Sequence, residues 1–156
     1  MTNTAPIRKS VEVPLSSKEA FTLFTEKMDT WWPLDRKGVS VGMGLPPSKE
    51  IRVDAREGGK VVEILDTQEE ALWGEILEWS PGERFRMTWQ PGRAADMPTE
   101  VEVTFTPVGN GCRVELVHSG FEAYAQGGEI KAMYSDGWDE LVGTLYASAA
   151  GVAVLV

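Results

Sequence analysis

The hydrophobic and polar positions near the start of the chain predict a strand followed by a helix. Apolar and polar residues alternate in IRKSVEV, which predicts a first strand over Ile7–Val13 after a loose N-terminus at 1–6. Ser16 and Glu19 then have the spacing of a capping box, in which each side chain accepts a hydrogen bond from the other residue's backbone N–H. A helix is therefore expected to begin directly after Ser16.

This helix carries an apolar stripe that leads to two adjacent tryptophans. Apolar residues recur at three- and four-residue spacing up to Met28, and the same period places Trp32 on the stripe with Trp31 at its edge. Pro33 disfavours helix at Trp32, and the polar stretch TEKMDT allows either one long helix or two short ones at an angle. Because adjacent helical residues point about 100° apart, at most one tryptophan is expected to face the interior fully. Periodicity favours Trp32, and an angled pair of helices would exchange the roles.

The pattern then changes twice. The segment from Leu34 to Glu50 has no sustained period and is rich in glycine and proline, which is typical of a long loop. From Ile51 onward three hairpins are predicted: IRVDA with KVVEIL, ALWGEILEW with RFRMTWQ, and TEVEVTFT with CRVELVH. Their alternation predicts an antiparallel meander with one dry face, formed by Phe85, Met87, Trp89, Val101, Val103 and Phe105.

The last segment returns to helical spacing. In YSDGWDELVGTLYASAAGVA, apolar residues from Tyr134 and Trp138 to Val152 form one stripe, with acidic residues away from it. Ser135 or Asp136 can cap this helix at its N-terminus. A long amphipathic helix is expected to close the chain.

Composition and charge narrow the function classes. The 156 residues fit one domain over 1–156, and 24 acids against 15 bases give a net charge of −9 without any basic run. Nucleic acid is therefore not an expected partner. The single cysteine, Cys112, and the single histidine, His118, exclude an internal disulfide and a Cys/His metal cluster, which fits a reducing cytoplasm. The tail GVAVLV is far shorter than the roughly 20 residues of a membrane span, so no membrane insertion is expected.

The order of these elements and several motifs resemble a known superfamily. FTEKMDTWWP, WGEILEWSPGERFRMTW, TEVEVTFTPVGNGCRVELVHSGF and GWDELVGTL follow one another along the chain. Together they resemble the SRPBCC (START/Bet v 1-like) superfamily. Within it, the chain is similar to the branch homologous to the C-terminal domain of the activator of heat shock protein 90 ATPase. The resemblance runs from about Ile7 to Leu145.

The resemblance implies an α+β helix-grip fold. A strongly curved seven-stranded antiparallel sheet would wrap around the long C-terminal helix, with two short helices after the first strand. Members commonly keep an apolar cavity between sheet and helix and bind lipids, sterols, polyketides or plant hormones, while some catalyse cyclisation and others act as co-chaperones.

The implied function is binding of a hydrophobic or aromatic small molecule in this cavity, without a cofactor. The alternative is a module that interacts with a chaperone, and a further alternative is a cyclase-like enzyme that uses the cavity. The protein is also a candidate for a homodimer. With Trp31 and Trp32 beside it, the loop from Leu34 to Glu50 is then expected to act as a mobile gate over the cavity mouth.

The side chains that face inward according to their spacing, taken together with the resemblance, predict which residues form the cavity wall. Six tryptophans in a domain of this size supply rigid apolar surface with N–H donors, although core packing is the alternative for any single one. The residues expected to bind the ligand are Trp31, Trp32, Trp73, Phe85, Met87, Trp89, His118, Tyr134 and Trp138.

Two polar residues, His118 and Glu75, are candidates for the polar groups of the cavity. His118 shares the apolar face of its strand with Leu116, so it either orients a ligand at the cavity edge or bonds to backbone or a neighbouring acid. Glu75 is two residues after Trp73, so in a regular strand both side chains lie on the same face and Glu75 is a candidate polar group of the cavity. A single β-bulge would instead turn Glu75 to solvent. No nucleophile motif and no catalytic residue is identified, and Cys112 is expected to lie away from His118.

Overall fold

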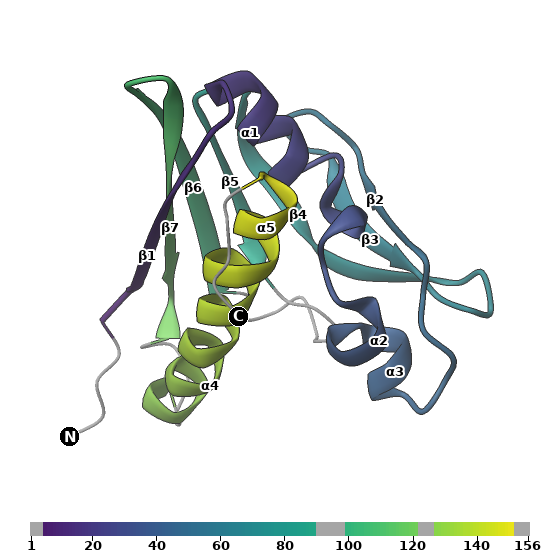
Figure 1. The fold of residues 1–156 in the computed structure, drawn as a ribbon. Helices are drawn as coiled ribbons and strands as arrows, with labels where there is room; N and C mark the ends of the chain where they lie inside the picture. Colours follow the sequence, from purple (N-terminus) through teal and green to yellow (C-terminus); the bar gives the residue numbers. More distant parts are fainter. Residues whose placement is uncertain (1–4, 90–98, 122–126, 152–156) are drawn as a thin grey trace.

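A seven-stranded antiparallel sheet forms the body of the protein, in the order β1-β7-β6-β5-β4-β3-β2 (Figure 1). The computed structural model describes residues 5–89, 99–121 and 127–151, without the side chains at 129 and 130; Gln90 and Val152, which the sequence places in a strand and a helix, lie outside these ranges. Every predicted hairpin pairs as expected. The strands are β1 (Ile7–Val13), β2 (Glu50–Val53), β3 (Lys60–Ile64), β4 (Glu70–Ser80), β5 (Arg84–Trp89), β6 (Thr99–Val108) and β7 (Gly111–Ser119).

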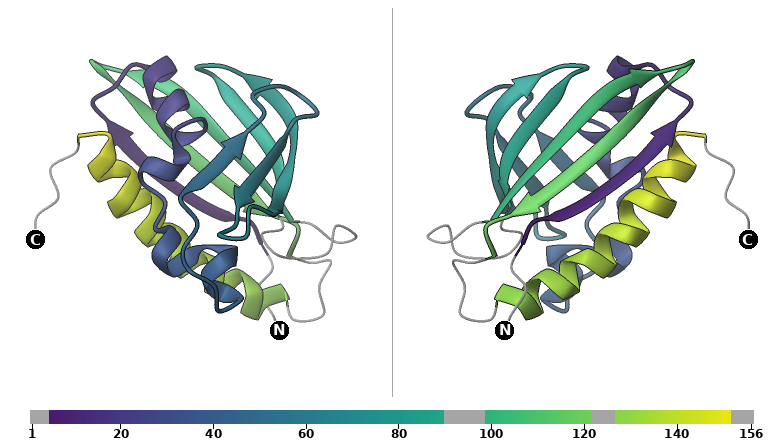
Figure 2. Two further views of the ribbon diagram at one scale, coloured as in Figure 1. Left: turned by 90° about the vertical axis from the view of Figure 1, so that its right-hand side faces the viewer. Right: turned by 90° about the vertical axis from the view of Figure 1, so that its left-hand side faces the viewer.

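The C-terminal helix lies against this sheet and runs along it. Both views in Figure 2 show it close to β1, with the sheet curling away from it, which confirms the helix-grip arrangement. The middle turns of this helix, Leu141–Tyr146, are π-helical. Among the described residues, no helix is long and apolar enough to cross a membrane. The helices are α1 (Ser17–Phe24), η1 (Met28–Thr30), α2 (Leu34–Lys37), α3 (Val39–Gly42), α4 (Gly127–Glu140), η3 (Leu141–Tyr146) and α5 (Ala147–Ala149).

The first helix has the predicted cap and stops early. Ser16 Oγ accepts from the Glu19 amide at 3.1 Å, and Glu19 Oε1 accepts from the Ser16 amide at 3.4 Å. At the other end, the Thr25 hydroxyl donates to the Phe21 carbonyl at 2.7 Å and competes with the continuing helical ladder. The stripe is therefore divided between α1 and η1, which is the angled pair of short helices rather than one long helix.

The segment between Leu34 and Glu50 is more ordered than the sequence predicts. It contains two four-residue helices, α2 and α3, separated by Gly38, so the prediction of a loop without helices is wrong. A helix of four residues is too short to show a 3.6-residue period, and tertiary contacts described below hold both in place. Figure 1 shows the pair beside the N-terminal half of the long helix.

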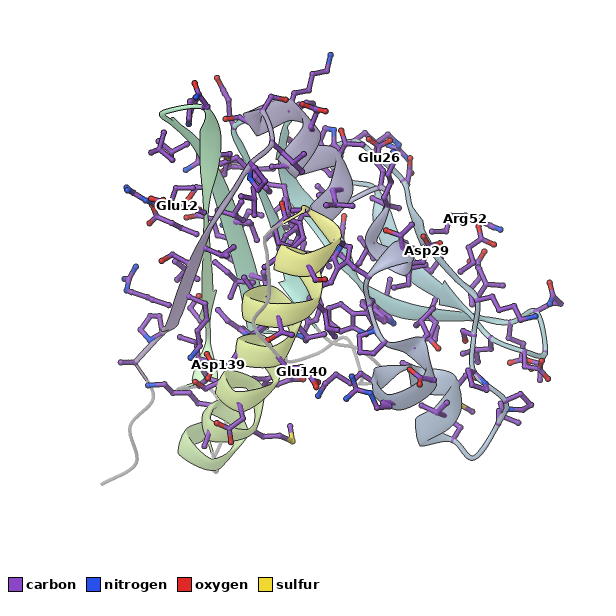
Figure 3. The ribbon with its side chains drawn as sticks, viewed as in Figure 1. Glu12, Glu26, Asp29, Arg52, Asp139 and Glu140 are labelled. Carbon is purple, nitrogen blue, oxygen red and sulfur yellow. The ribbon has the colours of Figure 1, made fainter. Side chains whose placement is uncertain are left out.

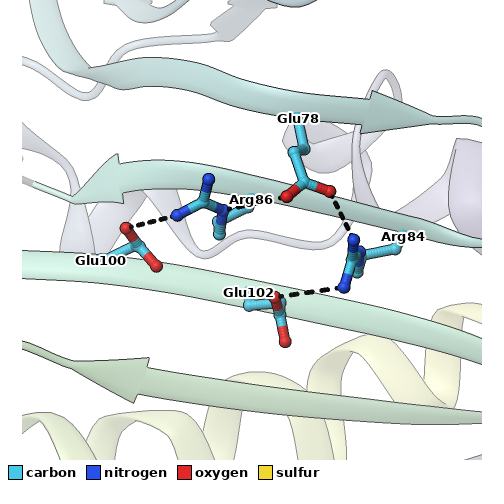
Figure 4. Close-up of polar contacts among 5 residues, drawn as sticks. All are labelled: Glu78, Arg84, Arg86, Glu100 and Glu102. Carbon is cyan, nitrogen blue, oxygen red and sulfur yellow. Dashed lines mark hydrogen bonds and ion pairs between the residues drawn. The ribbon is translucent and has the colours of Figure 1, made fainter.

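The two faces of the sheet separate apolar from charged residues as predicted. The six residues predicted for the dry face are at most 4% exposed. On the opposite face, Arg84 Nη2 lies 2.7 Å from Glu78 Oε2, and Arg86 Nη1 lies 3.1 Å from Glu100 Oε1 (Figure 4). Arg84 also pairs with Glu102 at 3.8 Å. This network keeps its five charged side chains on the outer, solvent-facing side of the sheet.

A bulge in β4 decides which way Glu75 points. Val61 pairs with Gly74 and Val62 pairs with Leu72, so Trp73 is an extra residue between them. Trp73 and Gly74 are both buried, and the parity after them is inverted. Glu75 is therefore exposed, and its interpretation as a polar cavity group is wrong.

Candidate functional site

A cavity of about 530 Å³ opens between α4, the α2–α3 segment and the end of β5. Pockets for small molecules commonly have about 300–1,000 Å³. Its wall is mainly aromatic and aliphatic, and glycines leave room at its rim. The side chains that matter most for its chemistry are Trp32, Lys37, Trp89, Tyr134, Trp138 and Leu141.

Only part of the predicted ligand-binding set lies at this cavity. Of the nine residues, Trp32, Trp89, Tyr134 and Trp138 line it. The other five are packed in the core: Phe85 and Met87 border a void of only about 10 Å³, which is about the space of one water. The sequence predicted which side chains face inward, but it did not separate packed from hollow parts of the interior. The five residues away from the cavity are Trp31, Trp73, Phe85, Met87 and His118.

The tryptophans around the cavity pack in fixed edge-to-face and tilted geometries. The ring of Trp32 lies 4.8 Å from that of Trp73, 5.9 Å from that of Trp89 and 6.0 Å from that of Trp138, between ring centroids. Trp89 and Trp138 are 5.2 Å apart. Such contacts restrain each ring, so the cavity has a preformed wall.

Trp31 and Trp32 are both buried, contrary to the prediction that only one faces the interior fully. They are 6% and 8% exposed, respectively. At Trp31 the backbone has φ −128° and ψ −17°, so the two residues are not successive positions of a regular helix and the separation of about 100° does not apply. Trp31 packs on Phe24 and Tyr146 in the core, while Trp32 turns to the cavity.

His118 belongs to a closed chain of hydrogen bonds between sheet and helix. The Trp138 indole N–H donates to His118 Nδ1 at 2.9 Å, and His118 Nε2 lies 2.7 Å from Thr99 Oγ1. The Thr99 hydroxyl donates to the Trp89 carbonyl at 3.0 Å, so it accepts from His118, which carries its proton on Nε2. Burial lowers the pKa of His118 to about 3, and the ring stays neutral. Both ring nitrogens of His118 are therefore used inside the protein, and neither is free to orient a ligand in this arrangement.

Glu63 is the polar residue that the sequence did not single out. Its side chain on β3 is fully buried and accepts from the amides of Val39 and Ser40 at 2.8 and 3.0 Å. The hydroxyl of Ser48 and the indole N–H of Trp73 donate to it at 2.7 and 3.2 Å. This carboxylate fastens the start of α3 to the sheet, and its four donors are all distant in sequence, so no local signal reveals it.

A second anchor holds α2 against the long helix. Arg36 Nη1 lies 3.0 and 3.2 Å from the two carboxylate oxygens of Glu140 on α4. Glu140 is labelled in Figure 3. Lys37 Nζ is 3.9 Å from the same carboxylate. Inside, the Trp32 indole N–H donates to the Lys37 carbonyl at 3.3 Å. The α2–α3 segment is thus tied to the sheet by Glu63 and to the helix by Glu140, and it covers the cavity between them.

The polar groups at the cavity are few. Among the side chains described as lining it, Lys37 and Tyr134 are the titratable ones. In residues 5–89, 99–121 and 127–151 there is no group of three or more His, Cys, Asp and Glu side chains placed to hold a metal ion. The described part of the cavity wall is therefore largely apolar and carries few polar side chains.

The curved sheet, the long helix against it and the aromatic cavity at its end define a helix-grip protein. The family described as Activator of Hsp90 ATPase homolog 1-like protein matches residues 15–149, and the chain belongs to this family. Fold and family fit a ligand-binding or a co-chaperone-like module. No curated protein sequence that was compared with the chain matches it.

Solved structures show the same fold. An anthrahydroquino-γ-pyrone synthase, Txn09, solved in complex with SUM, is 31% identical, with a TM-score of 0.58 and coverage of 82% of this chain and 84% of its own. An HSP90 activator from Plasmodium falciparum is 19% identical, with a TM-score of 0.67 over 93% and 96% of the two chains. The Aha1 dimer from Colwellia psychrerythraea is 15% identical, with a TM-score of 0.65 over 96% and 99%.

Proposed function

We propose that this protein binds an aromatic small molecule in the cavity between α4 and the α2–α3 segment. The observation that carries this proposal is a cavity of about 530 Å³ whose wall is formed by Trp32, Trp89 and Trp138. Three indole rings fixed by mutual packing offer flat apolar surfaces at little entropic cost, which suits a planar ring system better than a flexible chain. Binding is driven mainly by burial of apolar area, at roughly 25 cal/mol per Å².

Native mass spectrometry of the freshly purified protein, followed by calorimetry with anthraquinone-2-carboxylate as a probe, tests this function. A blocking variant, Gly137→Leu, places a side chain at the cavity, because Gly137 lines it beside Lys37. The matched control is Gly143→Leu on the same C-terminal helix, where an added Cβ meets nothing within 4 Å. Binding that is lost in Gly137→Leu and kept in Gly143→Leu supports the proposal, and binding that survives both substitutions contradicts it.

A second candidate is catalysis on the bound molecule, and one observation favours it. The synthase Txn09 is the relative reported above with the highest identity, 31%, and it shares most of the chain. Lys37 and Tyr134 line the cavity and are groups that can transfer protons. To decide between the two, a ligand recovered from the protein is incubated with fresh protein and then analysed by chromatography with mass detection. A new product indicates an enzyme, and unchanged ligand indicates a binding protein.

A further inference from the structure

Trp89 lines the cavity, and within the described part of the chain its indole N–H lacks the hydrogen bond that the other buried indoles have. Five tryptophans are buried, and four of them donate to an acceptor inside the protein: Trp31 to Leu23, Trp32 to Lys37, Trp73 to Glu63 and Trp138 to His118. Trp89 is 4% exposed, and its Nε1 is buried without an acceptor among the groups that the structure describes.

This exception coincides with the cavity. Trp89 lines the wall together with Trp32 and Trp138, and of these three indoles only that of Trp89 has no acceptor among the described residues. A buried donor without a partner is rare and costly, because it has lost its bond to water without gaining another. A ligand that brings an acceptor to Trp89 Nε1 removes this cost, so the site favours ligands with such an acceptor.

The outer side of the same cavity carries a positive charge with spare hydrogen-bonding capacity. The Lys37 side chain is 33% exposed, so its ammonium lies nearer to solvent than Trp89 does. The carboxylate closest to it, that of Glu140, is 3.9 Å away and is already held by Arg36 at 3.0 and 3.2 Å. An ammonium has three donors, and an anionic ligand group can use them without displacing the Arg36 pair.

Resting on the proposed function, we infer that the ligand is an acidic aromatic ketone or quinone. A ring carbonyl oxygen accepts from Trp89 Nε1 at the inner end of the cavity, and a carboxylate or phenolate meets Lys37 at the outer end. The three tryptophans hold the ring system between these two points. The two donors thus determine specificity, while the rings provide most of the affinity.

Calorimetry with three probes separates these contributions. Anthraquinone-2-carboxylate has both polar features, anthracene-2-carboxylate lacks the carbonyl oxygens, and 2-(hydroxymethyl)anthraquinone lacks the acid. We expect the first probe to bind about 3- to 10-fold more tightly than each of the others, as one net hydrogen bond predicts. Trp89→Phe is expected to abolish the preference for the quinone over the anthracene, and Lys37→Met the preference for the acid over the alcohol.

Trp79→Phe is the matched control, since Trp79 lies outside the cavity and contacts Phe21 and Phe85. It should leave all three affinities unchanged. Thermal unfolding of each variant monitors folding, and if Trp89→Phe does not fold, the comparison of probes on the unsubstituted protein decides the question. Equal affinities for the three probes, or preferences that persist in Trp89→Phe and Lys37→Met, overturn the inference while leaving the binding function intact. If no probe binds the unsubstituted protein, the proposed function fails as well.

Discussion

His118 Nδ1 on β7 accepts a hydrogen bond from the indole N–H of Trp138 on α4, over 2.9 Å. This bond joins the sheet to the long helix at a fully buried point directly behind the cavity wall. Because His118 also donates to Thr99, it fixes the position of Trp138, and through Thr99 it meets the carbonyl of Trp89. Histidine thus serves here to place two of the three tryptophans that form the wall.

The neutral state of His118 predicts an acid-dependent stability. Burial lowers its pKa from 6.5 to about 3, so between these values the unfolded chain takes up a proton that the folded protein does not. The free energy of unfolding therefore falls as the pH falls from about 6.5 to about 3, by up to about 1.4 kcal/mol per pH unit from this residue. In His118→Gln this contribution is absent. Urea denaturation at several pH values should show the two stabilities converging toward acid, and parallel curves would contradict the assignment.

Glu63→Gln is expected to loosen the segment that covers the cavity. Each carboxylate oxygen of Glu63 accepts from two donors, and the amide nitrogen that replaces one oxygen in glutamine cannot accept from its pair, so the free energy of unfolding should fall by about 1–3 kcal/mol. Hydrogen exchange at the amides of Val39 and Ser40 should accelerate more than exchange in β6. The control Glu69→Gln changes an exposed glutamate, where neither effect is expected. Unchanged protection of both amides in Glu63→Gln would show that Glu63 does not hold α3.

The adjacent tryptophans should differ in effect. Trp31→Phe removes the donor to the Leu23 carbonyl in the core and is expected to reduce stability by about 1–3 kcal/mol, with unchanged ligand affinity. Trp32→Phe removes the bond to the Lys37 carbonyl at the cavity and is expected to speed ligand exchange. Stopped-flow dissociation of anthraquinone-2-carboxylate and thermal unfolding measure the two effects. Equal rates of ligand dissociation in the two variants would contradict a role of Trp32 in ligand exchange.

Gly74 should tolerate no side chain. An added Cβ would lie 1.8 Å from the Thr88 carbonyl oxygen and 2.8 Å from the Met87 side chain, because β5 passes close to the bulge. Gly74→Ala is therefore expected to cost about 3 kcal/mol or more in the free energy of unfolding. Gly143→Ala adds a Cβ with no atom within 4 Å and should be neutral or stabilise by up to about 1 kcal/mol. Chemical denaturation compares them, and similar stabilities would contradict the tight approach at Gly74.

The sequence by itself determined the elements whose causes are local. The alternation in RFRMTW and TEVEV, the capping box of Ser16 and Glu19, and the final apolar stripe depend on residues a few positions apart, so pattern and spacing reveal them. Together with the resemblance, these elements were sufficient for the helix-grip fold. They also identified the aromatic residues that face inward, four of which line the cavity.

Tertiary structure alone decided which glutamate is buried and where the interior is hollow. Glu75 turns outward because a bulge formed with β3 inverts the parity of β4, and Glu63 stays inside because donors from residues 39, 40, 48 and 73 converge on it. The cavity depends likewise on how the Arg36–Glu140 pair sets α2 against the long helix. Such relations join residues far apart in sequence, and their energies depend on distances that exist only once the chain has folded.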